Sequence, residues 1–197
     1  LGAGMTPLIP GRLAGRDVRP GRRLDPRGKP MQQGQKLDAI DVRILSLLQK
    51  NGRTKKVELA SAVGLSLSSC WDRLQKLEQA GFVRGYYAEI DLTRMIKSEV
   101  IFTTLSLQYH TQAHFARFEQ AVKNIPEIIQ CHAVGGGIDY ILQIVALSIS
   151  HYQDIIDDLL SREIGISVYF TYVVTKVVKR YEGYPLAELL SHEAKKD

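Results

Sequence analysis

The sequence predicts an α+β protein with two folded domains, an N-terminal helix-turn-helix domain of the winged type and a C-terminal ferredoxin-like domain of βαββαβ order. Three observations lead to this fold class. Apolar residues recur at helical spacing through residues 37–82. Within that stretch, residues 54–80 have the pattern of two short helices joined by a tight turn at Gly64. From residue 99 onward, β-branched apolar runs alternate with two amphipathic helical stretches.

The composition is that of a globular protein with a basic N-terminal tail. The chain has 197 residues, of which 45% are hydrophobic and 24% charged, enough for one or two domains with their own cores. Residues 1–36 hold eight basic residues against two acidic ones, so this segment accounts for the net charge of +5. Its Gly, Pro and Arg content predicts disorder. Two interpretations stay open: an extension upstream of a natural start at Met31, or a basic arm that adds nonspecific phosphate contacts.

The predicted boundaries follow from these shifts in pattern. They are the tail over 1–36, the helix-turn-helix domain over 37–82, a linker or hinge strand over 83–98, the ferredoxin-like domain over 99–181 and a C-terminal tail over 182–197. No apolar run approaches the roughly 20 residues that cross a bilayer, and the first residues lack the pattern of a secretory signal. We therefore expect a cytoplasmic protein without a membrane partner. Cys70 and Cys131 lie in apolar patterns and are expected to be buried, reduced thiols, with a disulfide as the open alternative.

The first helix is predicted to begin at Asp38, because a second carboxylate, Asp41, follows three residues later, near the free N–H groups of the first turn. An apolar stripe at helical spacing follows, and Asn51-Gly52 ends the helix. The stripe consists of Ile40, Ile44, Leu45, Leu47 and Leu48.

The helix-turn-helix pattern itself has two apolar stripes with Gly64 between them. Ser66 is predicted to cap the second helix, because its hydroxyl can accept from the free N–H groups of the first turn. The stripe of the first helix is Val57, Leu59, Ala60 and Val63, and that of the second is Leu67, Cys70, Trp71, Leu74 and Leu77.

The outer face of the second helix is small, polar and partly basic, which suits the major groove of DNA. Ser68 and Ser69 allow a close approach, and Arg73 and Lys76 are long enough to reach bases or phosphates. The basic junction before this pair of helices is predicted to contact the DNA backbone. The alternative is an ordinary solvated helix and a basic loop. The predicted DNA-binding residues are Arg53, Lys55, Lys56, Ser66, Ser68, Ser69, Asp72, Arg73 and Lys76.

The second half of the chain has the order of a ferredoxin-like domain. Strands are expected over 100–107, 128–134, 140–146 and 168–178, with a glycine turn at 135–137, and 82–90 is expected to be an extended strand or connector. One predicted helix ends before Pro126, and the other carries Tyr152, Ile155 and Ile156. Both helices would cover one face of the sheet, so the other face must find a second surface, most simply a second subunit.

With these pieces assembled, the chain resembles the Lrp/AsnC family of transcription regulators from about residue 37 to 181. The resemblance rests on Leu37-Asp38-x-x-Asp41-x-x-Ile44-Leu45, Glu58-Leu59-Ala60-x-x-Val63-Gly64-Leu65-Ser66, Arg73-x-x-x-Leu77-Glu78-x-x-Gly81-Phe82-Val83-x-Gly85-Tyr86 and Gly136-x-x-Asp139-Tyr140-x-Leu142. It implies a sequence-specific regulator of double-stranded DNA that dimerises through its sheets and often forms octamers.

The resemblance also implies a small effector, usually an amino acid, bound at the loop between the second and third strands. Carried over by position, the effector-binding residues are Gly135, Gly136, Gly137, Asp139 and Tyr140. Glycines expose backbone N–H groups to a carboxylate, and Asp139 is suited to an ammonium group. A plain hairpin turn is the alternative. Gly137 stands where the family commonly has an acidic or polar side chain, and Ile138 stands where an aromatic is usual.

Two rival classes remain at this stage. Siroheme decarboxylases are similar to this family in architecture, and His132 beside Cys131 is the candidate for such a site. His110 and His114 have the spacing of metal ligands on one helix, but no third ligand is evident. The other rival is a sensor or assembly protein that no longer binds DNA. We predict a regulator, with no enzymatic activity, cofactor or metal.

Overall fold

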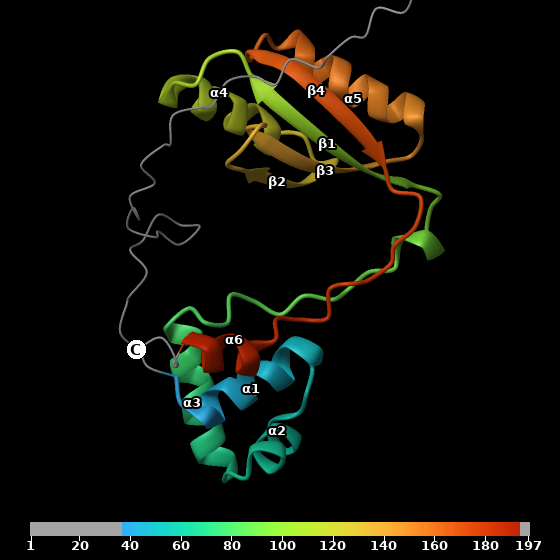
Figure 1. Ribbon diagram of the computed structural model, residues 1–197. Coiled ribbons are helices and arrows are strands. Elements are labelled where there is room, and N and C mark those ends of the chain that lie inside the picture. Colours follow the sequence, from blue (N-terminus) through green and yellow to red (C-terminus); the bar gives the residue numbers. More distant parts are fainter. Residues whose placement is uncertain (1–36, 194–197) are drawn as a thin grey trace, which may run out of the picture. The chain divides into compact units, whose positions relative to one another are not determined.

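The computed structural model describes residues 37–193 (Figure 1), and the predicted disordered tail lies outside them. The described residues form two units. One combines the residues up to Tyr86 with those from Gly183 onward, and the other is Tyr87–Glu182. The chain therefore passes between the units twice. No helix in the described part of the chain is long and apolar enough to span a bilayer.

Helix α1 (Ala39–Lys50) begins as predicted. The Asp38 carboxylate accepts a hydrogen bond from the Asp41 N–H at 2.8 Å, and the Asp41 carboxylate accepts from the Asp38 N–H at 3.2 Å. This reciprocal capping box satisfies two N–H groups that the helix leaves free. Asn51 ends the helix, also as predicted.

Helices α2 (Lys56–Val63) and α3 (Leu67–Gln79) confirm the predicted helix-turn-helix pattern. Gly64 ends α2 with a φ of 72°, a left-handed conformation that glycine adopts without strain. The core of this unit joins α1, α2 and α3. Its buried members are Ile44, Leu48, Leu59, Ala60, Val63, Cys70, Leu74 and Leu77.

A further helix, α6 (Leu186–Glu193), stands where the sequence analysis expects only a tail, and it lies beside α1 (Figure 1). The Gln49 side-chain amide binds the backbone of Tyr184 in both directions, donating to its carbonyl at 2.7 Å and accepting from its N–H at 2.9 Å. Gly183 makes this approach possible. Its φ is +110°, and a Cβ there would lie 2.6 Å from the Gln49 Cδ. Helix α6 is thus a fourth helix of the unit that contains α1, α2 and α3.

The predicted linker contains no strand. Its only regular element in the described structure is a short 3-10 helix, η1 (Leu92–Arg94), which begins where the Asp91 carboxylate accepts from the Thr93 N–H. Of the two forms expected over 82–90, the structure has the connector, because none of this backbone pairs with another strand.

The other unit has the predicted βαββαβ order: β1 (Glu99–Leu107), α4 (Gln112–Lys123), β2 (Ile128–Ala133), β3 (Tyr140–Ala146), α5 (Ile149–Ser161) and β4 (Ile166–Val173). The four strands pair antiparallel in the order β2-β3-β1-β4. This is the ferredoxin-like arrangement. β4 ends at Val173, opposite Ile101 in β1 and short of the predicted residue 178.

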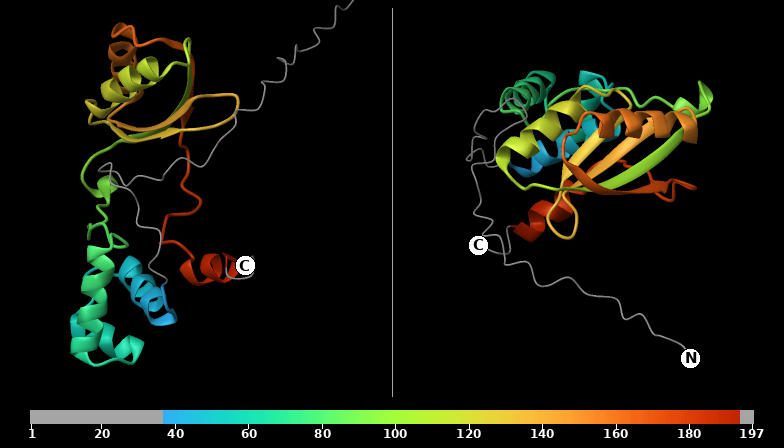
Figure 2. Two further views of the ribbon diagram at one scale, coloured as in Figure 1. Left: turned by 90° about the vertical axis from the view of Figure 1, so that its left-hand side faces the viewer. Right: turned by 90° about the horizontal axis from the view of Figure 1, so that it is seen from above.

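Helices α4 and α5 cover one face of this sheet (Figures 1 and 2). The core between them is apolar except for Thr103, whose hydroxyl is hydrogen-bonded to that of Tyr152 at 3.0 Å. The buried core residues are Ile101, Leu105, Leu107, Phe118, Val122, Ile125, Tyr140, Leu142, Ile144, Ala146, Tyr152, Ile155, Ile156, Leu159 and Ile164.

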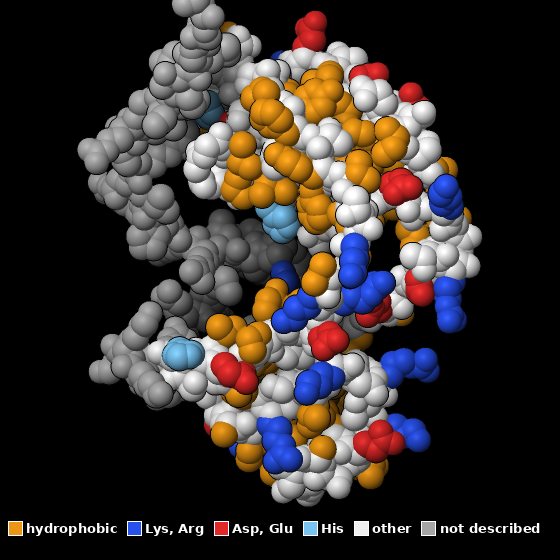
Figure 3. All heavy atoms as spheres, turned by 45° about the vertical axis from the view of Figure 1, so that its right-hand side comes forward, with side chains coloured by type: hydrophobic (Ala, Val, Ile, Leu, Met, Phe, Trp, Pro, Cys, Tyr) orange, Lys and Arg blue, Asp and Glu red, His pale blue; other side chains and the backbone are white. Residues whose placement is uncertain are grey.

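The opposite face of the sheet, which we call the open face, is not covered by any of the residues that the structure describes. Strand alternation turns Phe102, Val168, Phe170 and Tyr172 to that side, and all four are exposed. Phe102 lies directly opposite Tyr172 in the β1–β4 pairing. Figure 3 shows hydrophobic side chains gathered on this unit. An exposed apolar patch of this kind is typical of a protein interface.

Candidate functional site

The N-terminal turn of α3 is held by three serines. The Ser66 hydroxyl caps the helix by accepting from the Ser69 N–H at 3.2 Å, and it donates to the Ser69 hydroxyl at 2.9 Å. The Ser68 hydroxyl lies 3.2 Å from that of Ser66. All three side chains are exposed. This end of α3 is therefore ordered, small and polar, as close approach to a groove requires.

The predicted apolar stripe of α3 is only partly buried. Cys70, Leu74 and Leu77 face the core, and Trp71 is half-buried against it. Leu67 is 50% exposed, because it is the first residue of the helix and projects past the core. The other cysteine differs from its prediction, because Cys131 is exposed on the edge strand β2. Local desolvation of its sulfur, with the charge of Glu119 second, nevertheless raises the pKa of Cys131 to about 11.

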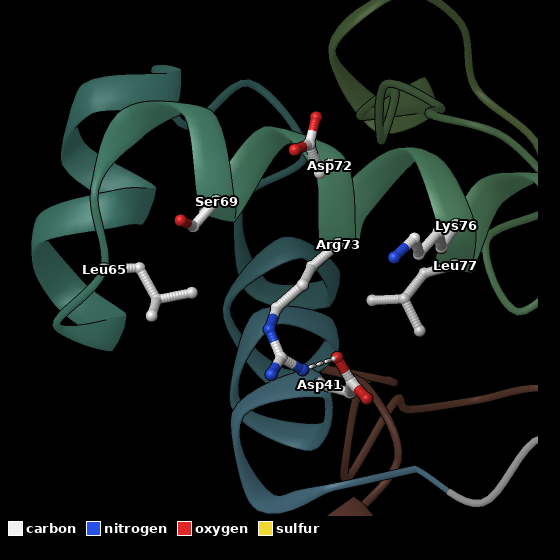
Figure 4. Close-up of a pocket in the computed structure, with 7 residues that line it drawn as sticks. All are labelled: Asp41, Leu65, Ser69, Asp72, Arg73, Lys76 and Leu77. Carbon is white, nitrogen blue, oxygen red and sulfur yellow. Dashed lines mark hydrogen bonds and ion pairs between the residues drawn. The ribbon is translucent and has the colours of Figure 1, made fainter.

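A hollow of about 540 Å³ lies along the outer side of α3. Figure 4 shows its lining from α1, the turn before α3 and α3 itself. Four of the predicted DNA-binding residues meet there. The full lining is Asp41, Leu65, Ser69, Asp72, Arg73, Lys76 and Leu77.

Arg73 forms ion pairs with two carboxylates that the sequence analysis did not predict as its partners. One guanidinium nitrogen lies 2.6 Å from the Asp38 carboxylate and 2.9 Å from that of Asp41, so the side chain joins α3 to the N-terminus of α1. Figure 4 shows Arg73 directed at Asp41. The Asp41 backbone N–H, with Arg73 second, lowers the pKa of Asp38. Both contacts use the same guanidinium nitrogen, Nη1, so a base contact would have to use the other N–H donors of Arg73 or displace the carboxylates.

We expect Arg73→Ala to lower the urea midpoint of the unit that contains α3, because it removes both contacts to the start of α1, and to weaken DNA binding by loosening α3. Lys76→Ala is the matched control, since Lys76 forms no ion pair with any described residue. It should lower DNA affinity and leave stability unchanged. Urea unfolding and a binding titration measure the two effects. If Arg73→Ala lowered affinity at unchanged stability, the predicted base contact would be right instead.

The basic junction is exposed at the start of α2. Lys55 is the N-cap residue and makes a loose, exposed ion pair with Glu58 at 3.8 Å. The Lys56 ammonium lies 3.2 Å from the centroid of the Trp71 ring. Arg53 is exposed in the turn before them, where its N–H donates to the Asn51 side chain. These side chains contribute little to folding, so their charges remain available to a ligand.

The predicted effector loop lies between β2 and β3. Residues 135–137 are exposed, and a Cβ added at any of them would meet open space. Only Gly136 requires glycine for its backbone, with a φ of +136°. The three glycines therefore leave an accessible stretch of backbone.

Asp139 fixes this loop to the end of β1. Its Oδ2 atom accepts from the Leu107 N–H at 2.9 Å and lies 2.9 Å from His110 Nε2. Its own N–H donates to the Leu105 carbonyl. The side chain is only 14% exposed. Asp139 therefore has a structural role. The sequence analysis considered such a role only in the form of a plain hairpin turn.

Tyr140 has a different orientation from the one its predicted role needs. Strand alternation turns it into the core, where it packs on Phe118 and its hydroxyl donates to Glu119 at 3.0 Å. Burial, then Glu119, raises the pKa of Tyr140 above its usual range. The structure thus brings the glycines and Asp139 together but separates the Tyr140 side chain from the loop surface. The alternation of side chains along β3 was the signal in the sequence, because it places Tyr140 on the same side as the buried Leu142 and Ile144.

His110 and His114 do not form the shared metal site that their spacing suggested. His110 pairs with Asp139, whereas His114 Nδ1 bonds the Thr111 hydroxyl at 2.7 Å, because His110 precedes α4 and does not share its face. His132 bonds Gln130 at 3.2 Å. Within residues 37–193, no three His, Cys, Asp or Glu side chains are placed to hold a metal ion. The sequence analysis missed the contact of His110 with Asp139, which joins residues 29 positions apart.

Comparison with known proteins identifies both units. Residues 37–84 match the family described as winged helix-turn-helix DNA-binding, and residues 100–184 match the Lrp/AsnC ligand binding domain. Helix α6 lies outside both matches. The chain is 44% identical to the transcriptional regulatory protein DoeX of Halomonas elongata over 145 residues, 74% of this chain and 92% of that protein. It is 37% identical to the leucine-responsive regulatory protein of Escherichia coli over 147 residues, 75% of this chain and 90% of that protein.

Solved structures agree with these relatives. A transcriptional regulator of Neisseria meningitidis, solved as a complex with L-Met, is similar with a TM-score of 0.73 and 32% identity, over 78% of this chain and 99% of that one. An AsnC family regulator of Agrobacterium tumefaciens has a TM-score of 0.72 and 27% identity, over 78% of this chain and 99% of that one.

Proposed function

The chain belongs to the Lrp/AsnC family of transcriptional regulators, and we propose that its α3 reads the major groove of its operator while a small amino acid binds the loop between β2 and β3. It acts on double-stranded DNA in the cytoplasm, as a homodimer or a larger assembly of dimers. It needs no cofactor and catalyses no reaction. The observation that carries the proposal is the capped, polar outer side of α3, flanked by exposed basic residues.

The DNA interface divides by chemistry. Ser68, Ser69 and Asp72 occupy the first two turns of α3, where recognition helices contact base edges. Asp72 is suited to accept from a cytosine amino group. Arg53, Lys55 and Lys76 supply positive charge for phosphates, which position the protein without reading sequence.

The effector site rests on the loop backbone. An amino acid presents a carboxylate and an ammonium group, and successive backbone N–H groups form a concave site for an anion. The exposed glycines 135–137 supply such groups, and His110 and Asp139 hold the base of the loop. The L-Met complex of the Neisseria meningitidis relative supports an effector of this class.

Oligomerisation rests on the open face of the sheet. Its exposed aromatic side chains are of the kind that is enriched in interfaces. A two-fold symmetric dimer would present two α3 helices, so the operator is expected to be roughly palindromic, with half-sites one or more helical turns apart. The octamer implied by the family resemblance would add contacts between such dimers.

A salt titration tests this function. The full chain is titrated with a duplex from upstream of its own gene and with a scrambled duplex, with and without a mixture of the common amino acids. We expect at least a roughly thousandfold preference for the native duplex at physiological salt, and an affinity that the amino acids change. Equal, steeply salt-dependent binding to both duplexes would show that only charge is being recognised and would contradict the proposal.

A further inference from the structure

The contact between Lys56 and Trp71 joins the two helices of the helix-turn-helix through a side chain on each. Lys56 is the first residue of α2, and Trp71 lies in the second turn of α3. The ammonium stands 3.2 Å from the ring centroid, well within the range of a cation–π interaction. Trp is the aromatic side chain that attracts a cation most strongly.

The ring is packed against the core, and the lysine over it is exposed to solvent. Trp71 is half-buried and packs against the core of the unit, whereas the Lys56 side chain is exposed. A free lysine loses rotamer freedom when it binds a phosphate. A lysine already held over an indole has lost part of that freedom during folding. An ammonium over the ring face directs at least one N–H at the ring, and its other donors stay available to a phosphate.

The groups beside Lys56 at the start of α2 also suit a phosphate. Lys55 occupies the N-cap position, but its side chain makes no capping hydrogen bond. The first N–H groups of α2 are therefore left without a side-chain partner. Lys55 adds a second positive charge beside them. An anion there would meet the helix dipole as well as the lysines.

We propose that Trp71 is a positioning residue for DNA binding, holding the Lys56 ammonium ready for a backbone phosphate. This inference rests on the proposed function, since it requires Lys56 to be part of the DNA interface. Trp71 itself need not touch DNA. The neighbouring Lys55, which pairs loosely with Glu58 and does not contact the ring, provides a matched comparison.

The first measurement detects the contact without DNA. Trp71 is the only tryptophan of the chain. Fluorescence that is excited at a wavelength absorbed by tryptophan but not by tyrosine therefore reports on this ring alone. We expect Lys56→Gln to shift the emission maximum of the free protein, because it removes the charge over the ring. Lys55→Gln should leave the spectrum unchanged. Equal spectra for wild type and Lys56→Gln would overturn the proposal.

The second measurement is a double-mutant cycle on DNA affinity. The loss of one phosphate contact reduces the slope of log affinity against log salt concentration by about 0.9. The loss of affinity is therefore about eightfold greater at 0.1 M salt than at 1 M. We expect Lys56→Gln to show this loss and Trp71→Leu to show about half of it on a logarithmic scale. In a Trp71→Leu background, Lys56→Gln should then reduce DNA affinity by a smaller factor than it does in the wild type. Lys55→Gln should reduce DNA affinity by the same factor in both backgrounds.

Trp71→Phe guards against a purely structural effect, because it keeps an aromatic face over which the lysine can lie. It should recover most of the affinity lost in Trp71→Leu. Equal losses from Lys56→Gln in both backgrounds, or tighter DNA binding by Trp71→Leu, would overturn the positioning role and leave the proposed function intact. If neither lysine variant changed DNA affinity, the proposed interface at α2 would fail as well.

Discussion

Replacing Phe170 with glutamate is expected to dissociate the protein into monomers and to weaken operator binding by at least about a hundredfold. Phe170 is 54% exposed in the middle of the open face, between Val168 and Tyr172 on the same side of β4. A carboxylate buried against a second subunit would lose its hydration without a partner. A monomer binds one half-site and loses the gain in affinity that two linked half-sites provide.

Ile149→Glu is the matched control for this variant. Ile149 is 52% exposed, but it begins α5 and so belongs to the helical layer of the unit. A glutamate at the start of a helix is compatible with its dipole. Light scattering after size exclusion should give the mass of an oligomer for the control and of a monomer for Phe170→Glu. An unchanged mass for Phe170→Glu would place the interface elsewhere.

Local signals in the sequence predicted most of the fold. The Asp38–Asp41 capping box, the left-handed Gly64 and the Ser66 cap each depend on residues no more than three positions apart, so a pattern in the sequence defines them. The open face was predicted as well, because the βαββαβ order places both helices on one face of the sheet.

Contacts over long sequence separations could not be predicted in this way. Arg73 reaches carboxylates 35 and 32 positions away, and Gln49 meets the backbone of Tyr184 at a separation of 135. The single sequence contains no periodicity that pairs such residues. Helix α6 itself did have a signal, since Leu186, Leu189 and Leu190 follow Pro185 at helical spacing.

The candidate site shows the same division. The serines of α3 were predicted from local pattern, and the glycines 135–137 were predicted by position from the family resemblance; both sets are exposed in the structure. The roles of Arg73 and Asp139 depend on partners that the fold brings to them, and for Arg73 those partners are the two carboxylates at the start of α1.

Asp139→Ala is expected to abolish the response to the amino-acid effector while leaving effector-free operator binding within about twofold, an allowance smaller than the loss of one base contact. The substitution leaves the Leu107 N–H without its acceptor, at a cost of about 1–3 kcal/mol to the sheet unit. It also releases His110 and the loop of residues 135–137. The DNA-binding unit has its own core, so its affinity should survive. Operator titrations with and without amino acids, together with urea unfolding, measure these effects.

Asp139→Asn separates the two possible roles of this carboxylate. The asparagine side chain keeps an oxygen that can accept from the Leu107 N–H, but it carries no charge for an ammonium group. Because Asp139 is nearly buried and its Oδ2 atom is already engaged with Leu107 and His110, we expect this variant to keep the loop and most of the response. Loss of the response in Asp139→Asn at unchanged stability would instead assign Asp139 the direct ammonium contact that the family resemblance implies. A normal response in Asp139→Ala would exclude both roles, since neither the charge nor the acceptor would then be needed for effector binding.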